Sequence, residues 1–250
     1  MAPEQRVALA AEMSDEIRAI TEAGIRHRNP AFTDDEVRAA LAVIVLGRED
    51  AARLRARRVA PRPVSLAALL VGTIARLERA GVPYMITGSV ASSYHGEPRA
   101  TRDLDIVIDP DLGGIDRLVG ELDADGWYVD AEAAHRALAD RTQFNAIDAT
   151  TGWKIDLLVR KDRPFSREEF GRRTRANLLG TPAWIASPED TIIAKLEWAA
   201  ASGSDRQLAD VAAMLDIGGD SLDLAYIDRW VTGLGLQAAW NRTQAPRSAD

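Results

Sequence analysis

Two aspartates at the start of an apolar run are the clearest sign of chemistry in this sequence. Asp103 and Asp105 are separated by one residue, and Ile106, Val107 and Ile108 follow. Side chains at i and i+2 of a strand point to the same face, about 6–7 Å apart. A continuous apolar run is typical of a buried strand rather than a solvated edge strand. Carboxylates placed there repel each other unless they share a cation, and Mg²⁺ prefers hard oxygen ligands of this kind together with phosphate oxygens.

A Gly-Ser pair lies upstream of these acids. Gly88 and Ser89 follow the apolar residues 84–87 and precede residues 90–94, a sequence that predicts a strand, a tight turn and a helix. The free backbone N–H groups at the start of a helix suit a phosphate. A phosphate-binding turn combined with metal-binding carboxylates is the arrangement that transfers phosphoryl or nucleotidyl groups.

The spacing of these motifs resembles a known family. Gly88-Ser89, thirteen intervening residues, and then Asp103 and Asp105, with Thr101 two positions before the first acid, resemble the signature of the polymerase-beta-like nucleotidyltransferase superfamily. Within it the chain is most similar to the minimal bacterial enzymes related to AbiEii-type toxins of toxin–antitoxin and phage-defence systems. The resemblance implies two Mg²⁺ ions on the carboxylates and nucleotide contacts from Gly88, Ser89 and Thr101.

The superfamily pattern includes a third carboxylate on a neighbouring strand. Asp156 is the candidate, because it stands alone among apolar residues in a predicted strand over 152–159. A surface-facing acid on an alternating strand is the alternative, although Leu157 and Leu158 interrupt that alternation. A lone aspartate within an apolar run is costly unless it is paired or bound to metal. The resemblance implies that Asp156 completes the metal site and helps to deprotonate an attacking hydroxyl group.

Two consecutive helices near the end of the chain carry further candidates. Ser187 and Pro188 form a strong helix start, and Lys195 lies next to the apolar stripe of that helix. The next helix carries Arg206 and Asp210, one turn apart. By resemblance, Lys195, Arg206 and Asp210 line the nucleotide pocket. Two alternatives remain open: Lys195 extends over apolar surface to reach water, and Arg206 and Asp210 form an ordinary i,i+4 pair.

Composition narrows the class of protein. The chain has 250 residues, of which 46% are hydrophobic and 28% charged, as in globular domains. The absence of cysteine excludes disulfides, a thiol nucleophile and cysteine-ligated zinc. We find no leader sequence, and the apolar runs are shorter than the roughly 20 residues needed to span a bilayer, so we expect a cytoplasmic protein without a membrane partner.

Charge is unevenly distributed along the chain. The net charge of −7 argues against tight non-specific binding of nucleic acid by the whole surface. Residues 160–175 are an exception, with seven basic and three acidic side chains directly after the strand that carries Asp156. This basic segment is either a groove for a polyanionic acceptor or a solvated connection held by ion pairs.

The N-terminal part is predicted to be a separate module. Residues 1–63 contain helices over 6–27 and 34–46 and a Pro-rich linker at 59–63. Residues 13–26 resemble small helical proteins often encoded beside this type of nucleotidyltransferase. The module is either a regulatory, antitoxin-like element or a packing element, and a homodimer through its helices is a further expectation. A chain that begins near residue 64 is expected to fold by itself.

The remaining chain predicts an α/β (α+β) fold. Residues 64–186 alternate between helix and strand, which indicates a nucleotidyltransferase core with a small mixed β-sheet flanked by helices. Residues 187–240 predict a helical C-terminal subdomain, and residues 241–250 predict a flexible polar tail.

The predicted function is Mg²⁺-dependent transfer of a nucleoside monophosphate from an NTP to an acceptor hydroxyl group. The acceptor is an RNA 3′ end, a protein side chain or a small molecule, and the sequence does not choose between them. A role as the toxin of a toxin–antitoxin or phage-defence system fits the resemblance. The alternative is a non-catalytic partner on the same fold that binds a nucleotide or a protein.

Overall fold

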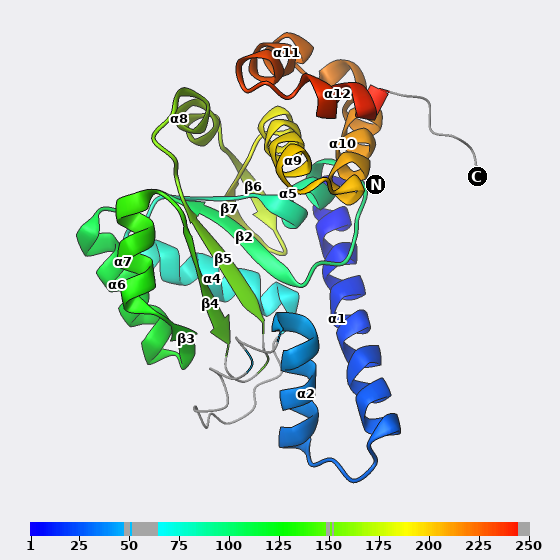
Figure 1. The fold of residues 1–250 in the computed structure, drawn as a ribbon, viewed down its shortest axis with the longest axis vertical. Coiled ribbons are helices and arrows are strands. Elements are labelled where there is room, and N and C mark those ends of the chain that lie inside the picture. The colour runs from blue at the N-terminus through cyan, green and yellow to red at the C-terminus, as the bar shows by residue number, and fades with distance from the viewer. Residues whose placement is uncertain (48–50, 52–64, 149–150, 152, 245–250) are drawn as a thin grey trace.

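A mixed β-sheet forms the centre of the protein. The computed structural model describes residues 1–47, 51, 65–148, 151 and 153–244. Within these residues the sheet has seven strands in the order β3-β4-β5-β2-β1-β7-β6 (Figure 1). Pairs β2–β5 and β1–β7 are parallel, and the other neighbouring pairs are antiparallel. The strands are β1 (Tyr84–Ile86), β2 (Asp103–Ile108), β3 (Trp127–Val129), β4 (Gln143–Asp148), β5 (Lys154–Val159), β6 (Thr174–Leu178) and β7 (Thr181–Ile185).

Helices surround the sheet and extend beyond it at both ends of the chain. The described residues contain α1 (Pro3–Arg28), α2 (Asp34–Leu46), α4 (Leu66–Ala80), α5 (Gly88–His95), α6 (Leu112–Ala124), α7 (Ala131–Asp140), α8 (Pro164–Gly171), α9 (Pro188–Ser202), α10 (Asp205–Gly218), α11 (Leu224–Gly233) and α12 (Gln237–Gln244). The predicted α/β (α+β) fold class, with a mixed sheet, N-terminal helices and a helical C-terminal part, is therefore confirmed.

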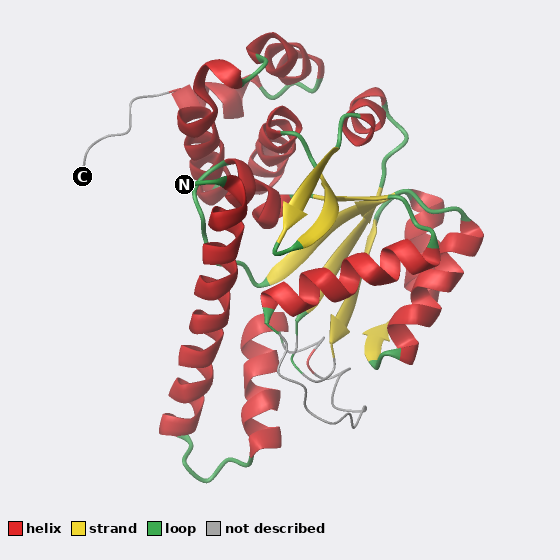
Figure 2. Ribbon diagram, turned by 180° about the vertical axis from the view of Figure 1, so that it is seen from behind, coloured by secondary structure: helices red, strands yellow, loops and turns green. Residues whose placement is uncertain are grey.

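The main hydrophobic core lies between the sheet and helices α4, α6 and α7. On β2 the buried residues Leu104, Ile106 and Ile108 alternate with half-buried Asp103, Asp105 and Val107. Because strand side chains alternate between faces, the apolar set packs against the core helices, of which α4 lies in front of the sheet in Figure 2, and the acids point to the opposite face. The same alternation on β5 places Lys154, Asp156 and Leu158 on the acid-bearing face.

The C-terminal helices form a second core above the end of the sheet (Figure 1). Helix α9 begins as predicted, with Pro188 in its first turn and the Ser187 side chain accepting a hydrogen bond from the Asp190 N–H. Ile192, Ile193 and Leu196 are completely buried and join α9 to α10 and α11. Helix α9 also packs against α5, so the second core adjoins the Gly-Ser turn.

The N-terminal helices form an antiparallel hairpin, and α1 belongs to the main core. Thr33 and Glu36 make reciprocal capping-box hydrogen bonds at the start of α2. Val7 and Ala11 of α1 are buried in the main core, and the Arg6 guanidinium donates to the Tyr94 carbonyl oxygen at 3.1 Å. Helix α1 thus packs against the sheet domain along its first half. The boundary near residue 64 stays a prediction, and the linker at 59–63 lies outside the described residues.

Two details differ from the sequence-based expectation. Helix α8 with strand β6 occupies the basic segment, which was interpreted as a groove or a connection. Helix α12 continues to Gln244, so it includes the first four residues of the predicted tail at 241–250. None of the described helices is both long enough and apolar enough to cross a membrane.

Candidate active site

The parallel pairing of β2 with β5 brings the three predicted acids together. Asp105 lies directly opposite Asp156, and Asp103 lies opposite Lys154. Neighbouring strands are about 4.8 Å apart, so these side chains are adjacent on one face. Burial, and then the charges of Asp103 and Asp156, raise the pKa of Asp105 to about 7. A nearby cation would therefore stabilise the ionised form of this carboxyl group.

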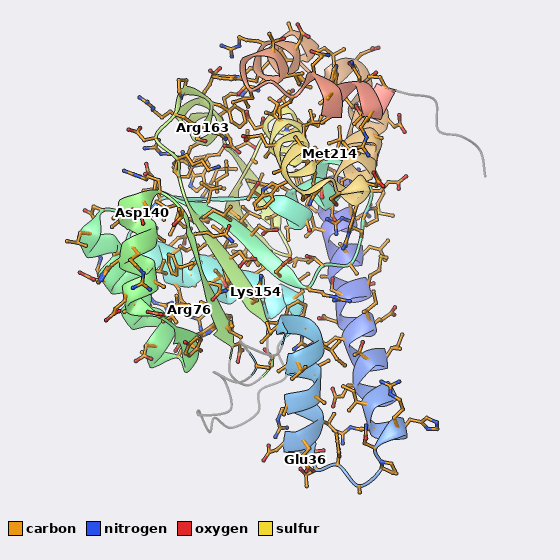
Figure 3. All side chains as sticks on the ribbon, in the orientation of Figure 1. Glu36, Arg76, Asp140, Lys154, Arg163 and Met214 are labelled. Carbon is orange, nitrogen blue, oxygen red and sulfur yellow. The ribbon has the colours of Figure 1, made fainter. Side chains whose placement is uncertain are left out.

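Lys154 supplies a cation that the sequence analysis missed. Its Nζ lies 2.7 Å from Asp156 Oδ2 and 3.8 Å from Asp103 Oδ2. The ammonium group therefore neutralises part of the acid cluster (Figure 3 labels Lys154 on the open face of the sheet). Lys154 and Asp156 are two positions apart on one strand, and the sequence does not show that β2 pairs beside them.

Two of the three acids are placed to bind a magnesium ion. Asp103 and Asp105 provide hard oxygen donors on one face, and Mg²⁺ is commonly held by one or two carboxylates plus substrate phosphates. Asp156 is turned towards Lys154. In the part of the chain that the structure describes, no three acidic or imidazole side chains are arranged to hold a metal as they stand. A metal-binding role for Asp156 stays a prediction.

The turn at Gly88 is fitted to Asp105. Gly88 has φ +61°, and a Cβ atom at this position would lie 1.9 Å from Asp105 Oδ2. Only glycine allows both the backbone conformation and the close approach. The Ser89 backbone N–H donates to the Asp105 carboxylate, which opposes the rise in its pKa. The start of α5 and the acid at the strand therefore form one unit.

A cavity of about 310 Å³ opens over this unit. It is lined by seven of the nine residues predicted from the sequence, namely Gly88, Ser89, Thr101, Asp103, Asp105, Lys195 and Arg206. Asp156 and Asp210 do not line it. Residues more than 100 positions apart in sequence thus meet around one space, as the later motifs implied.

Lys195 is buried at the wall of the cavity. Its exposed fraction is 3%, which excludes the alternative that it extends to bulk water. Its Nζ lies 2.7 Å from Asp210 Oδ2 and 2.9 Å from Gln207 Oε1. Burial lowers the pKa of Lys195, and the Asp210 carboxylate opposes that shift. A desolvated ammonium group beside a cavity is suited to binding a phosphate.

Asp210 acts as an anchor for two cations. Besides Lys195 it accepts from Arg99 Nε at 2.9 Å, and Arg99 in turn donates to Ser89 Oγ at 2.8 Å. Asp210 therefore influences the cavity through Lys195 and Arg99. Arg206 donates to the Ala100 carbonyl oxygen at 3.1 Å, and among the described residues it forms no ion pair with Asp210.

Arg99 was missed because its partner lies far away in sequence. It lines the cavity with Arg102, and both belong to the loop between the Gly-Ser turn and the acids. Two arginines in the loop between a phosphate-binding turn and a metal-binding strand were the available signal.

Helix α1 contacts Thr101, two positions before the acid-bearing strand begins. The Thr101 N–H donates to Ser14 Oγ at 2.9 Å, and Ser14 is 3% exposed. The Thr101 hydroxyl group is within 3.1 Å of Asp103 Oδ1 and within 3.0 Å of the Asp103 carbonyl oxygen. The N-terminal helix is thus two hydrogen bonds away from the first acid of the site.

The basic segment is largely committed to ion pairs. Arg160 lies 2.9 Å from Asp109, Arg163 binds Glu197, and Arg172 bridges Glu189 and Asp190. These contacts favour the interpretation of an ion-paired connection over that of an open groove for a polyanion.

We compared the chain with models of protein families and with curated protein sequences. Residues 1–63 match the family model of the Rv0078B-related antitoxin. No curated protein sequence matches the chain.

Three solved structures are similar in arrangement. The antibiotic-resistance factor ANT(2″)-Ia has a TM-score of 0.49 and 14% identity, over 71% of this chain and 95% of that one. A nucleotidyltransferase-like protein from Paracoccidioides brasiliensis has a TM-score of 0.44 and 20% identity, over 70% and 91%. ANT(2″)-Ia in complex with adenylyl-2″-tobramycin has a TM-score of 0.45 and 15% identity, over 70% and 97%. The geometry of the site, rather than these distant similarities, supports the proposal that follows.

Proposed function

We propose that the protein is a Mg²⁺-dependent nucleotidyltransferase that moves a nucleoside monophosphate from an NTP to a hydroxyl acceptor. One observation carries the proposal: Asp103 and Asp105 share a single cavity with the Gly88 turn and the buried Lys195. Metal-binding carboxylates, a helix N-terminus and a desolvated cation are the groups needed to hold a triphosphate and stabilise charge during its cleavage.

Each group has a distinct part in this reaction. Asp103 and Asp105 would hold Mg²⁺, with two ions expected, and the metal would neutralise charge on the α-phosphate and orient the attacking oxygen. Ser89 and Lys195 bind the triphosphate, and Thr101 fixes the position of Asp103 through the hydrogen bond described above. The acceptor hydroxyl group loses its proton near Asp156, attacks the α-phosphorus, and pyrophosphate leaves.

The acceptor and the biological role are parts of the same proposal. An RNA 3′ end, a protein side chain and a small molecule remain the three candidate acceptors. The similarity of residues 1–63 to an antitoxin family supports a place in a toxin–antitoxin or phage-defence system. The hydrogen bond from Thr101 to Ser14 offers a route by which such a segment influences the site.

A non-catalytic binding protein is the second candidate. Lys154 favours it, because its ammonium group already neutralises Asp156 and Asp103 without a metal. Such a protein would bind a nucleotide but transfer nothing.

The test combines binding with turnover. Calorimetry with a hydrolysis-resistant NTP analogue should show binding that depends on Mg²⁺, and pyrophosphate release should follow when NTP is incubated with cell extract. Binding without release by the wild type supports the second candidate. Absence of Mg²⁺-dependent binding contradicts both.

A further inference from the structure

A second cavity of about 230 Å³ adjoins the first. The two share four lining residues, Thr87, Leu158, Ala194 and Trp198, so they lie side by side. Val107 and Leu158 lie in the second cavity, and each is two residues beyond an acid on the same strand face. Two strand residues advance about 6–7 Å. The second cavity therefore begins within one nucleoside length of the acids.

Helix α9 presents different chemistry to the two cavities. Lys195 faces the first, together with Arg99 and Arg206, which are suited to phosphates. Trp198, almost one turn later, lines both cavities and is 52% exposed. Tryptophan is usually well buried, and an exposed indole at the border of a cavity is a surface on which a flat ring can stack.

Glu169 of α8 contributes a carboxyl group to the wall of the second cavity. Its exposed fraction is 7%, and its side chain lines the second cavity. Three other polar groups at this wall are occupied with one another, because Arg163 binds Glu197 at 2.7 Å and also donates to Ser166 (Arg163 is labelled in Figure 3).

The protonation of Glu169 suits a neutral ligand. Burial, and then the charges of Asp190 and Glu197, raise its pKa to about 8, against the opposing influence of Arg163 and Lys161. A protonated carboxyl group offers one donor and one acceptor side by side. This pair matches the donor–acceptor edge of a nucleobase and does not suit a phosphate.

We propose that the second cavity is the nucleobase subsite of the enzyme, with the base stacked on Trp198 and its polar edge hydrogen-bonded to Glu169. The inference rests on the proposed function, because the triphosphate must lie on the Gly88 turn and Lys195 for the base to reach this space. It assigns Trp198 and Glu169 to substrate binding, and neither residue is part of the sequence signature.

The test separates the base from the phosphates. Calorimetry with Mg²⁺ compares a hydrolysis-resistant NTP analogue with inorganic tripolyphosphate, which has no base. Trp198→Ala should weaken NTP binding about fivefold to a hundredfold, since stacking of a base contributes roughly 1–3 kcal/mol. Tripolyphosphate binding should not change in this variant.

Glu169 is tested with two substitutions and a control. Glu169→Leu should weaken NTP binding and leave tripolyphosphate binding unchanged, whereas Glu169→Gln should keep NTP affinity close to wild type because an amide retains a donor and an acceptor. Glu168→Leu is the matched control, because Glu168 lies on the same helix, pairs with Arg229 and lines neither cavity.

Three results decide between the proposals. Equal loss of NTP and tripolyphosphate affinity in Trp198→Ala would overturn the subsite. Unchanged NTP affinity in both Trp198→Ala and Glu169→Leu would also overturn it, would leave the proposed function standing, and would make the cavity a candidate for the acceptor. Failure of the wild type to bind either ligand would overturn the proposed function and the subsite together.

Discussion

Replacing Gly88 by alanine tests the connection between the turn and the acid most sharply. The new Cβ would lie 1.9 Å from Oδ2, 2.5 Å from Cγ and 2.6 Å from Cβ of Asp105. Because the Oδ2, Cγ and Cβ atoms of Asp105 would all be too close to the new Cβ, rotation of the Asp105 carboxylate group does not relieve the contact. Either Asp105 leaves its position or the start of α5 moves away from β2.

The expected loss of stability has two parts. The left-handed conformation of Gly88, with φ +61°, costs a residue with a Cβ about 1–2 kcal/mol. Gly180 isolates this part, because it has φ +82° and a Cβ added there would meet no neighbouring atom within 4 Å. Gly180→Ala should therefore lower the free energy of unfolding by about 1–2 kcal/mol, and Gly88→Ala by more, since overpacking commonly adds about 1–3 kcal/mol.

The assay is urea unfolding of both variants, followed by calorimetry with Mg²⁺ and the NTP analogue. Gly88→Ala should lose binding, and Gly180→Ala should bind like the wild type because its turn lies in the β6–β7 hairpin, away from the cavity. Equal destabilisation of the two variants, with NTP binding kept in Gly88→Ala, would refute the reasoning.

Four further predictions concern single residues. Lys195→Met should weaken NTP binding, measured by calorimetry, about tenfold to a hundredfold, since a charge-assisted hydrogen bond contributes roughly 1.5–3 kcal/mol. Unchanged NTP affinity would show that Lys195 does not bind the phosphates. Asp103→Asn and Asp105→Asn should each abolish transfer without appreciably lowering the free energy of unfolding, because each relieves repulsion between acids; near-normal transfer would disprove the metal site. Ser14→Ala should lower kcat more than it raises KM, with Ser14→Thr restoring part of the loss, whereas unchanged kinetics would show that α1 only packs. For Glu169, whose pKa is raised from 4.5 to about 8, the folded state holds a proton that the unfolded state releases, so stability should fall as pH rises through that window. Glu169→Gln should flatten that slope in unfolding experiments, and an unaltered slope would contradict the assignment.

The local part of the site could be predicted from the sequence. Gly88, Ser89, Asp103 and Asp105 lie within one strand–turn–helix–strand segment, and alternation along β2 fixes which face the acids share. The sequence itself predicted the helix that starts at Ser187, and the resemblance placed Lys195 of that helix in the nucleotide pocket.

The missing part depends on contacts between distant segments. Arg99 is hydrogen-bonded to Asp210, which lies 111 positions later in the sequence. Lys154 lies opposite Asp103 because of the register in which β5 pairs with β2. Neither relation leaves a periodic signal in the sequence. The Pro-rich break also suggested a module separate from the core, yet Val7 of α1 is buried in the main core, which only the folded chain reveals.

The most direct test of the central claim follows the label from two differently labelled nucleotides. Each NTP, labelled with ³²P at either the α- or the γ-phosphate, is incubated with the protein, Mg²⁺ and total cellular RNA and protein. The proposed function predicts that α-label appears in an acceptor while γ-label appears only in pyrophosphate, and that Asp105→Asn stops both. Transfer of γ-label to the acceptor, or no transfer by a wild-type protein that binds the NTP, would contradict it.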